Sequence, residues 1–194
     1  MSHFLPVETS RVHTMAAVDL APHLNNVALT AMQNLGDGRL NVWGNSLQFE
    51  TIPSGRLSVD GVPFETFNEV DSEPDNIRCD AQYLKLPESK ADWLHLLTAA
   101  ERRCEETVHI HYSSGAVDPE WIRVSDFWPA RAHFGESLAA TSPSMHYPHH
   151  RQGNLSGQLW AVRIPVTRRE PVRALRLPDN PALHIFALTM ETVR

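Results

Sequence analysis

The sequence has little cysteine, and its two thiols stand alone. Only Cys79 and Cys104 occur among 194 residues, and neither belongs to a CxxC or other zinc-binding spacing. Two cysteines do not make the disulfide framework of a small secreted protein. Because the N-terminus also shows no basic region followed by an apolar one, we expect two buried, reduced thiols and a cytoplasmic protein.

Long apolar runs and an excess of positive charge are missing too. No apolar stretch approaches the roughly 18 residues of a membrane-spanning helix, so we expect no membrane partner. The chain has 17 Lys and Arg against 23 Asp and Glu, a net charge of −6. This balance argues against nucleic-acid binding, which needs a basic surface. No P-loop, GxGxxG, HExxH or GxSxG motif is present, so the enzyme classes that depend on these motifs are excluded.

What the sequence does contain is a series of short apolar runs separated by turns. Hydrophobic residues make up 42% of the chain, as in a globular protein with one sizeable core. Turn sequences such as Asp60-Gly61 and Ser113-Ser114-Gly115 recur between the runs, at a spacing typical of an all-β sandwich or barrel. We therefore expect a loose leader over residues 1–16 and a single β-sandwich domain over residues 17–194.

The C-terminal third has the clearest strand pattern. In Leu159–Val166 apolar residues alternate with others, which predicts a half-buried strand with Trp160 in the core. Pro171–Leu177 predicts a second strand. Leu183–Met190 is apolar on both faces and predicts a central strand, in which His184 is a buried, hydrogen-bonded histidine.

Two segments have a helical pattern instead. Ala91–Cys104 places its apolar residues at helical spacing and is rich in Ala, Leu, Glu and Arg. Leu24–Leu35 has a similar pattern. Propensity alone predicts a helix in both.

Six groups of residues form a series along the chain. In order, they are Val18–Pro22 with Asn25-Asn26, Val59–Phe64, Asp75–Asp80 with Gln82, His109–Tyr112 with Gly115, Ser125–Trp128, and Leu177–Pro181 with Leu183–Ala187. The series resembles the jelly-roll β-sandwich modules of bacteria, galactose-binding-like in shape, that occur alone or beside glycoside-hydrolase domains. This resemblance implies two facing antiparallel sheets and a short strand, in place of a helix, at about Trp93–Thr98.

A pair of histidines is the first candidate for function. His109 and His111 point to the same side of the expected strand, opposite the apolar Val108, Ile110 and Tyr112. That polar face is either a ligand-binding surface or an ordinary solvated one. Two such imidazoles could also chelate a metal, but a third ligand would have to come from the 146–150 region. We assign no metal and no cofactor.

A histidine-rich stretch, Ser144–Arg151, is the second candidate. It lies in Pro129–Gln158, which we expect to be one long loop, and loops longer than about 12–15 residues are uncommon unless functional or disordered. The loop is either mobile and solvated, or it forms a wall over the face of His109 and His111.

Two further groups carry acidic side chains. Trp128 could stack on a sugar while Asp126 accepts hydroxyl hydrogen bonds, but Trp128 is equally suited to the core. Oxygen atoms of Asp75, Asn76 and Asp80 could hold calcium, although such residues form turns without any ion.

These observations favour a module that binds a carbohydrate or similar polar small molecule on a polar sheet face. The predicted ligand-binding residues are His109, His111, Asp126, Trp128, His146, Tyr147, His149 and Arg163. The alternative is an intracellular small-molecule enzyme, a cyclase, lyase or isomerase of secondary metabolism, with His111 and His146 as acid and base in the same cavity. A third interpretation, an interaction or oligomerisation domain, leaves a homodimer open.

Overall fold

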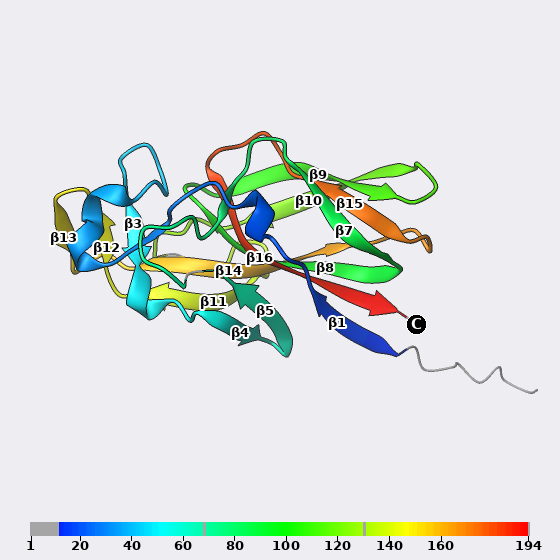
Figure 1. Ribbon diagram of the computed structural model, residues 1–194, viewed down its shortest axis with the longest axis horizontal. Helices are drawn as coiled ribbons and strands as arrows, with labels where there is room; N and C mark the ends of the chain where they lie inside the picture. The colour runs from blue at the N-terminus through cyan, green and yellow to red at the C-terminus, as the bar shows by residue number, and fades with distance from the viewer. Residues whose placement is uncertain (1–11, 68, 130, 194) are drawn as a thin grey trace, which may run out of the picture.

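The computed structural model describes residues 12–67, 69–129 and 131–193, which are built almost entirely of β-strands (Figure 1). The helices among them are three short 3₁₀ segments, η1 (Ala21–His23), η2 (Met32–Asp37) and η3 (Phe49–Thr51). None of these described helices is long and apolar enough to cross a membrane. The all-β fold class predicted from the sequence is confirmed.

One layer of the sandwich is a six-stranded antiparallel sheet. Its strands follow the order β1-β16-β8-β14-β11, and β6 also pairs with β16. Their bounds are β1 (His13–Ala17), β6 (Ile77–Arg78), β8 (Ala91–Ala100), β11 (Ser137–Ser142), β14 (Gly157–Pro165) and β16 (Leu183–Val193). Residues 13–16, expected in the leader, thus belong to the first strand, while residues 1–11 lie outside the described residues.

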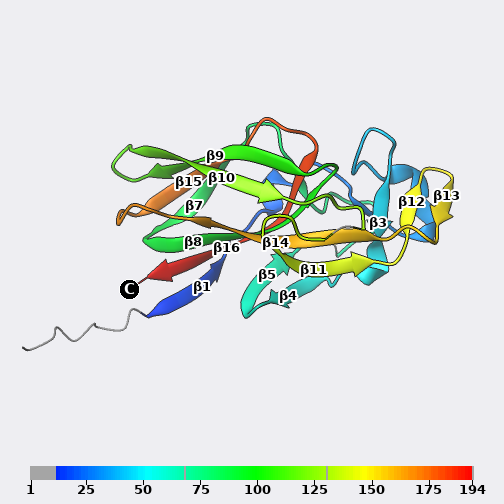
Figure 2. The ribbon, with the colours of Figure 1, turned by 180° about the vertical axis from the view of Figure 1, so that it is seen from behind.

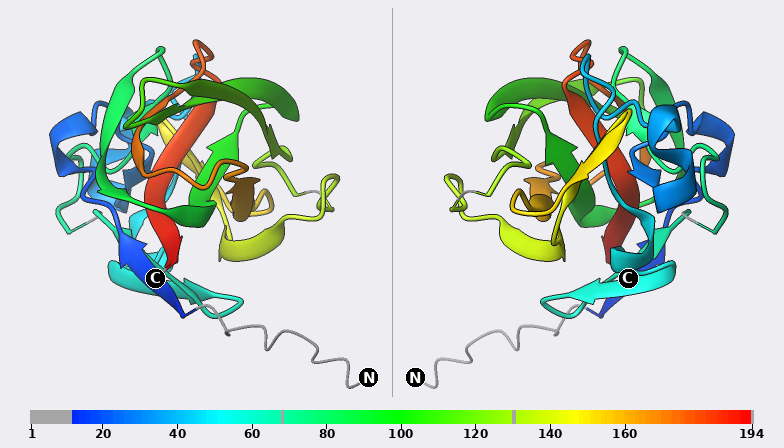
Figure 3. Two further views of the ribbon diagram at one scale, coloured as in Figure 1. Left: turned by 90° about the vertical axis from the view of Figure 1, so that its right-hand side faces the viewer. Right: turned by 90° about the vertical axis from the view of Figure 1, so that its left-hand side faces the viewer.

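The other layer is a four-stranded antiparallel sheet with the order β10-β9-β15-β7. Its strands are β7 (Tyr83–Ser89), β9 (Cys104–Tyr112), β10 (Val117–Val124) and β15 (Val172–Arg176). Figure 3 views the two layers from either end of the molecule.

The order of the strands is that of a jelly roll. When β1, β7, β8, β9, β10, β14, β15 and β16 are counted from one to eight in chain order, the sheets read 1-8-3-6 and 2-7-4-5. The pairs 1-8, 2-7, 3-6 and 4-5 make one long antiparallel ribbon that is rolled into two sheets. The predicted two-sheet, antiparallel jelly-roll sandwich is therefore confirmed.

Two insertions in this ribbon join to form a third, small sheet. The insertion between β1 and β7 supplies β2 (Leu29–Thr30) and β3 (Ser46–Gln48), and that between β10 and β14 supplies β12 (Met145–Tyr147) and β13 (His150–Gln152). They pair in the order β13-β12-β3-β2 at one end of the molecule (Figure 1). The expected loop over residues 129–158 thus contains β11, β12 and β13. The local sequence does not predict these strands. β12, for example, pairs with β3, which lies about a hundred residues earlier in the chain.

The main core lies between the two large sheets. It is formed by alternate side chains such as Leu94 and Leu96 on β8 and Val108 and Ile110 on β9, all fully buried. Trp160 belongs to this core as predicted. Both cysteines are free and buried there.

A second apolar cluster covers part of the outer face of the six-stranded sheet. The hairpin of β4 (Gly55–Val59) and β5 (Val62–Thr66) packs on this face, with β5 against β16 and β1, and β4 against β11 (Figure 2). Asp60 and Gly61 form its tight turn with φ of 51° and 82°, as a type I′ turn requires. The hairpin leaves the remaining part of the outer face for polar side chains.

Neither segment forms the helix predicted from propensity along its length, although the end of the second, from Met32, lies in the 3₁₀ segment η2. β8 buries apolar side chains on both faces, Leu94 and Leu96 in the main core and Leu97 in the second cluster, so the strand implied by the resemblance is confirmed. In the 24–35 segment, the backbone N–H groups of Ala28 and Leu29 donate to the carboxylate of Asp75. These long-range bonds hold the backbone extended, because a helix would direct those N–H groups along its own axis.

Candidate functional site

The histidine pair lies on the outer face of the four-stranded sheet. His109 and His111 are partly exposed there, opposite the buried Val108 and Ile110, as the alternation predicted. The ring of His111 packs edge-on against Tyr83 with 4.9 Å between ring centroids. Partial burial, followed by the positive charge of Arg173, lowers the pKa of His111. This ring is therefore neutral at pH 7.

The histidine-rich stretch lies far from that pair. β12 and β13 form one end of the molecule, whereas the turn that follows His111 lies at the other end (Figure 1). The predicted grouping of His109 and His111 with His146, Tyr147 and His149 is therefore corrected. The reason is the pairing of β12 with β3, which holds the stretch away from the four-stranded sheet.

His146 is a core residue rather than an accessible one. It is fully buried, and its Nδ1 lies 3.0 Å from the hydroxyl of Thr30, which in turn lies 2.6 Å from that of Ser46. Burial lowers the pKa of His146, so the neutral ring links β12 to β2 and β3. Nearby, Tyr147 stacks on His150 with 5.0 Å between centroids.

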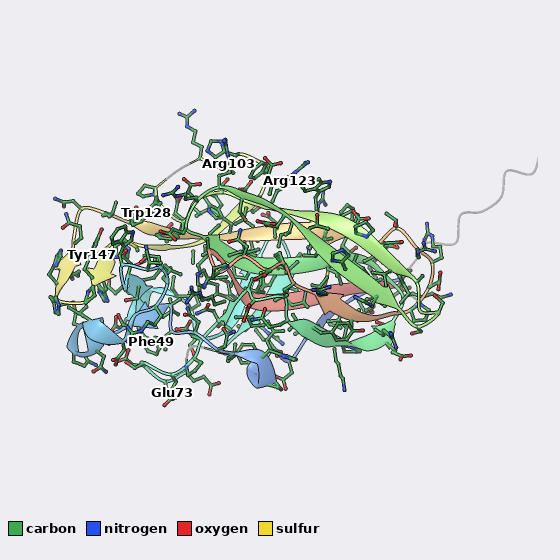
Figure 4. The ribbon with its side chains drawn as sticks, turned by 90° about the horizontal axis from the view of Figure 1, so that it is seen from above. Phe49, Glu73, Arg103, Arg123, Trp128 and Tyr147 are labelled. Atoms are coloured by element: carbon green, nitrogen blue, oxygen red, sulfur yellow. The ribbon has the colours of Figure 1, made fainter. Side chains whose placement is uncertain are left out.

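Asp126 and Trp128 serve the packing of the sandwich. The backbone carbonyl of Asp126 accepts a 2.9 Å hydrogen bond from the indole N–H of Trp160. Trp128 is half-buried and packs against Phe127 at 4.4 Å. Figure 4 shows Trp128 toward the same end as Tyr147, with Arg123 farther along the molecule.

The acidic cluster at Asp75 is a buried structural network. The carboxylate accepts hydrogen bonds from Ala28, Leu29 and Asn76, so its oxygens join three parts of the backbone and side-chain network. Burial raises the pKa of Asp75 to about 7. His184 donates 2.8 Å from Nδ1 to the side-chain oxygen of Asn76, which confirms its predicted burial and bonding.

No metal centre is evident in the described part of the chain. Among residues 12–67, 69–129 and 131–193, no three His, Cys, Asp or Glu side chains are grouped closely enough to hold an ion. The chelate considered for His109 and His111 lacks its third ligand there, because the 146–150 region lies at the other end.

A cavity of about 810 Å³ opens elsewhere, on the outer face of the six-stranded sheet. Strands β8 and β14 contribute Trp93, His95 and Arg163, the β4–β5 hairpin contributes apolar side chains, and β10 contributes Glu120 and Trp121. Of the ligand-binding residues predicted from the sequence, Arg163 alone is among the described residues that line it. We take this cavity as the candidate functional site.

A histidine–carboxylate pair lies at one side of the cavity. His95 is nearly buried and its Nε2 lies 2.9 Å from Glu191 Oε2, while the other oxygen of Glu191 lies 3.0 Å from His13 Nδ1. A carboxylate only accepts, so both rings donate to it. The bond fixes the orientation and the tautomer of His95 in the cavity wall.

Arginines stack on both tryptophans of the cavity. The guanidinium of Arg163 lies 4.5 Å from the centroid of Trp93, and that of Arg123 lies 5.5 Å from the centroid of Trp121. Arg123 also forms a 3.2 Å ion pair with Glu105. Such stacking holds the plane of a guanidinium while its edge stays free to donate hydrogen bonds.

Glu120 adds a carboxyl group without a partner. Within the described residues it forms no side-chain hydrogen bond or ion pair. Partial burial, with a smaller contribution from the negative charge of Asp118, raises the pKa of Glu120. A carboxyl of this kind exchanges protons more readily near neutral pH than an exposed one does.

The sequence did contain a signal for part of this cavity. Trp93 and His95 alternate with Leu94 and Leu96, so a strand at this position presents them opposite the core. The helical spacing of the same residues obscured that face. Glu120, Trp121 and Glu191 come from other strands, and only the folded ribbon brings them near.

A search of curated proteins finds no match. The sequence model of the AziU2-like beta-sandwich domain family matches residues 14–194, nearly the whole chain, in agreement with the observed sandwich. The chain therefore belongs to the AziU2-like β-sandwich domain family.

Proposed function

We propose that the domain binds a carbohydrate or similar polar small molecule in the cavity of the six-stranded sheet. The observation that carries this proposal is the cavity itself, because about 810 Å³ lies within the roughly 300–1,000 Å³ of small-molecule sites. The likeness of several segments to galactose-binding-like modules supports the same class of ligand.

The side chains around the cavity suit such a ligand. Trp121 is 57% exposed, which leaves much of its ring available to the apolar face of a sugar. Glu120 and Arg163 offer an acceptor and a donor for hydroxyl groups, and charged partners form the stronger hydrogen bonds. His95 is held in place by Glu191, so its position is set before the ligand arrives.

The polar face of His109 and His111 is the rival location, and one pair of variants separates the two. Trp121 and Tyr83 are both exposed aromatic residues, at 57% and 41%. Trp121 lines the cavity, whereas Tyr83 contacts His111. Trp121→Ala should abolish binding and Tyr83→Ala should leave it unchanged.

The experiment titrates the wild type and both variants with a panel of sugars and polar metabolites. NMR and calorimetry detect the binding. Binding that survives Trp121→Ala but not Tyr83→Ala would move the site to the four-stranded sheet. A panel without any binding at millimolar concentrations would contradict the proposal. Melting temperatures of both variants serve as the folding control.

An acid–base enzyme is the second candidate, and Glu120 favours it. The proton-transfer roles first considered for His111 and His146 pass to Glu120 and His95, since His146 is fully buried and His111 lies outside the cavity. If a binding ligand is turned over, Glu120→Gln should lower kcat by about a hundredfold or more, a much larger effect than the loss of affinity caused by exchanging a charged acceptor for a neutral one. An unchanged kcat would remove Glu120 from the chemistry.

A further inference from the structure

Arg163 lies in the cavity with its charge unpaired. It projects from β14 on the outer face, directly beside His95 of β8 in the strand register. Among the described residues it has no carboxylate within ion-pair distance and no side-chain hydrogen bond. Glu191, on the same face, already accepts hydrogen bonds on both oxygens from His95 and His13. The guanidinium of Arg163 is thus free to receive another anion.

Four other arginines each lie within 4 Å of a carboxylate, whereas Arg163, like Arg176 and several other described arginines, does not; what sets Arg163 apart is its place in the cavity wall. The pairs are Arg56–Glu65 at 3.9 Å, Arg123–Glu105 at 3.2 Å, Arg168–Asp118 at 2.7 Å and Arg169–Asp92 at 3.7 Å. Where a carboxylate of the chain is within reach, these arginines use it. Arg163 is held instead by the ring of Trp93, which supplies no hydrogen-bond acceptor.

Stacking on Trp93 also prepares the guanidinium for one geometry of binding. A ring against the face of the guanidinium leaves the two parallel N–H groups at its edge free for another acceptor. Two parallel donors match the two oxygens of a carboxylate or of a phosphate group. Less side-chain freedom is lost on binding, because the tryptophan has already restricted the arginine.

We propose that the cavity recognises its ligand through an oxyanion, a carboxylate or phosphate group that binds the edge of Arg163. This inference rests on the function proposed above and narrows it from polar small molecules to acidic ones, such as a sugar acid or a sugar phosphate. Glu120 and Trp121, which also line the cavity, contact the uncharged part of the ligand.

The chain offers a matched control. Arg176 is also an exposed arginine on a sandwich strand without an ion-pair partner in the described residues, but it lies on β15 beside His109. It is outside the cavity. An anion bound only by non-specific electrostatic attraction would bind Arg163 and Arg176 equally.

The test follows the side-chain Nε–H signals of Arg163 and Arg176 and the indole signal of Trp121 by NMR. The probes are glucose, glucuronate and glucose 6-phosphate, which share a ring and differ in the oxyanion, together with acetate and inorganic phosphate. About 150 mM salt screens weak surface attraction. Calorimetry then compares the wild type with Arg163→Gln, Arg163→Lys and Arg176→Gln.

We expect at least one acidic sugar to shift Arg163 and Trp121 and to bind about tenfold more tightly than glucose, as one charged pair of hydrogen bonds allows. Arg163→Gln should reduce its affinity to that of glucose, Arg163→Lys should retain part of the gain, and Arg176→Gln should retain all of it. Whichever of glucuronate and glucose 6-phosphate binds more tightly distinguishes a carboxylate from a phosphate.

Three results would overturn the inference. Equal shifts of Arg163 and Arg176 would mean non-specific attraction. Binding of glucose as tight as that of both acidic sugars, with Trp121 shifted and Arg163 unmoved, would remove the oxyanion and leave the proposed function intact. No response of Trp121 or Arg163 to any probe would remove both.

Discussion

The buried histidine of β16 gives the sharpest prediction for the fold. His184 is fully buried, and this burial lowers its pKa from 6.5 to about 4. The unfolded chain therefore takes up a proton on this ring near pH 6.5, while the folded protein keeps the ring neutral until about pH 4. The stabilising contribution of the neutral ring is complete above about pH 6.5 and is lost as the pH falls from there to about 4.

The size of the effect follows from the shift. One pKa unit corresponds to about 1.4 kcal/mol, so the full interval corresponds to about 3 kcal/mol, and the fall from pH 7 to pH 5 to about 2 kcal/mol. Asp75 acts in the opposite direction. Its raised pKa of about 7 stabilises the folded state at low pH, and this contribution is lost as the pH rises from about 4 to 7. The stability of the wild type alone therefore does not isolate the histidine.

Substitution of His184 does isolate it. The variant His184→Gln keeps a donor for Asn76 and has no titrating ring, while Asp75 is common to both proteins. In urea unfolding at pH 7, the wild type should have the higher free energy of unfolding. The difference between the two proteins should be smaller by about 2 kcal/mol at pH 5. As a control, the wild type should be more stable than Ile185→Val, a change at a neighbouring buried position, by an amount that does not change with pH. If the stability difference between the wild type and His184→Gln were the same at both pH values, the proposed role of His184 would be refuted.

Three other substitutions test the packing. Gly157→Ala would place a methyl carbon 2.2 Å from the buried Leu47, and we expect a loss of about 1–3 kcal/mol in urea unfolding; an unchanged midpoint would contradict the close approach. Leu96→Ala in the main core should cost about 2–5 kcal/mol in the same assay, and a cost below about 1 kcal/mol would contradict its burial. Thr30→Val removes the hydroxyl that bonds His146 and should cost about 1–3 kcal/mol, measured by calorimetry; an unchanged melting temperature would show that this bond contributes nothing.

Most of the sandwich could be predicted from the sequence because its strands carry local signals. The alternation over Leu159–Val166 and the turn at Asp60-Gly61 each correspond to the observed structure. The extended first part of the segment 24–35 could not be predicted, because the carboxylate that accepts from Ala28 and Leu29 belongs to Asp75, far along the chain. The strands within 129–158 were hidden for the same reason.

The candidate site was less accessible to sequence reasoning. The sequence indicated His109, His111 and His146 because histidines are concentrated around them. The two groups are nevertheless far apart in the structure. The cavity depends on which strand faces which, and His95, Glu120 and Glu191 come from three different strands and lie 25 or more positions apart in the sequence. The alternation of Arg163 on β14 places it opposite the buried residues of that strand, but the prediction grouped it with His109 and His111, and it lines the cavity of the six-stranded sheet instead.

The two insertions that form the small sheet at the end of the molecule depend on each other, because each supplies the strand that the other pairs with. Deletion of the later one would strip β3 of its neighbour β12 and leave an open strand edge, to which other chains could add. Deletion of the earlier one would do the same to β12 and would uncover the ring of His146, which Thr30 and Ser46 now enclose. Any shortened form of this domain must therefore give up both insertions together, and homologues should gain or lose them as a unit.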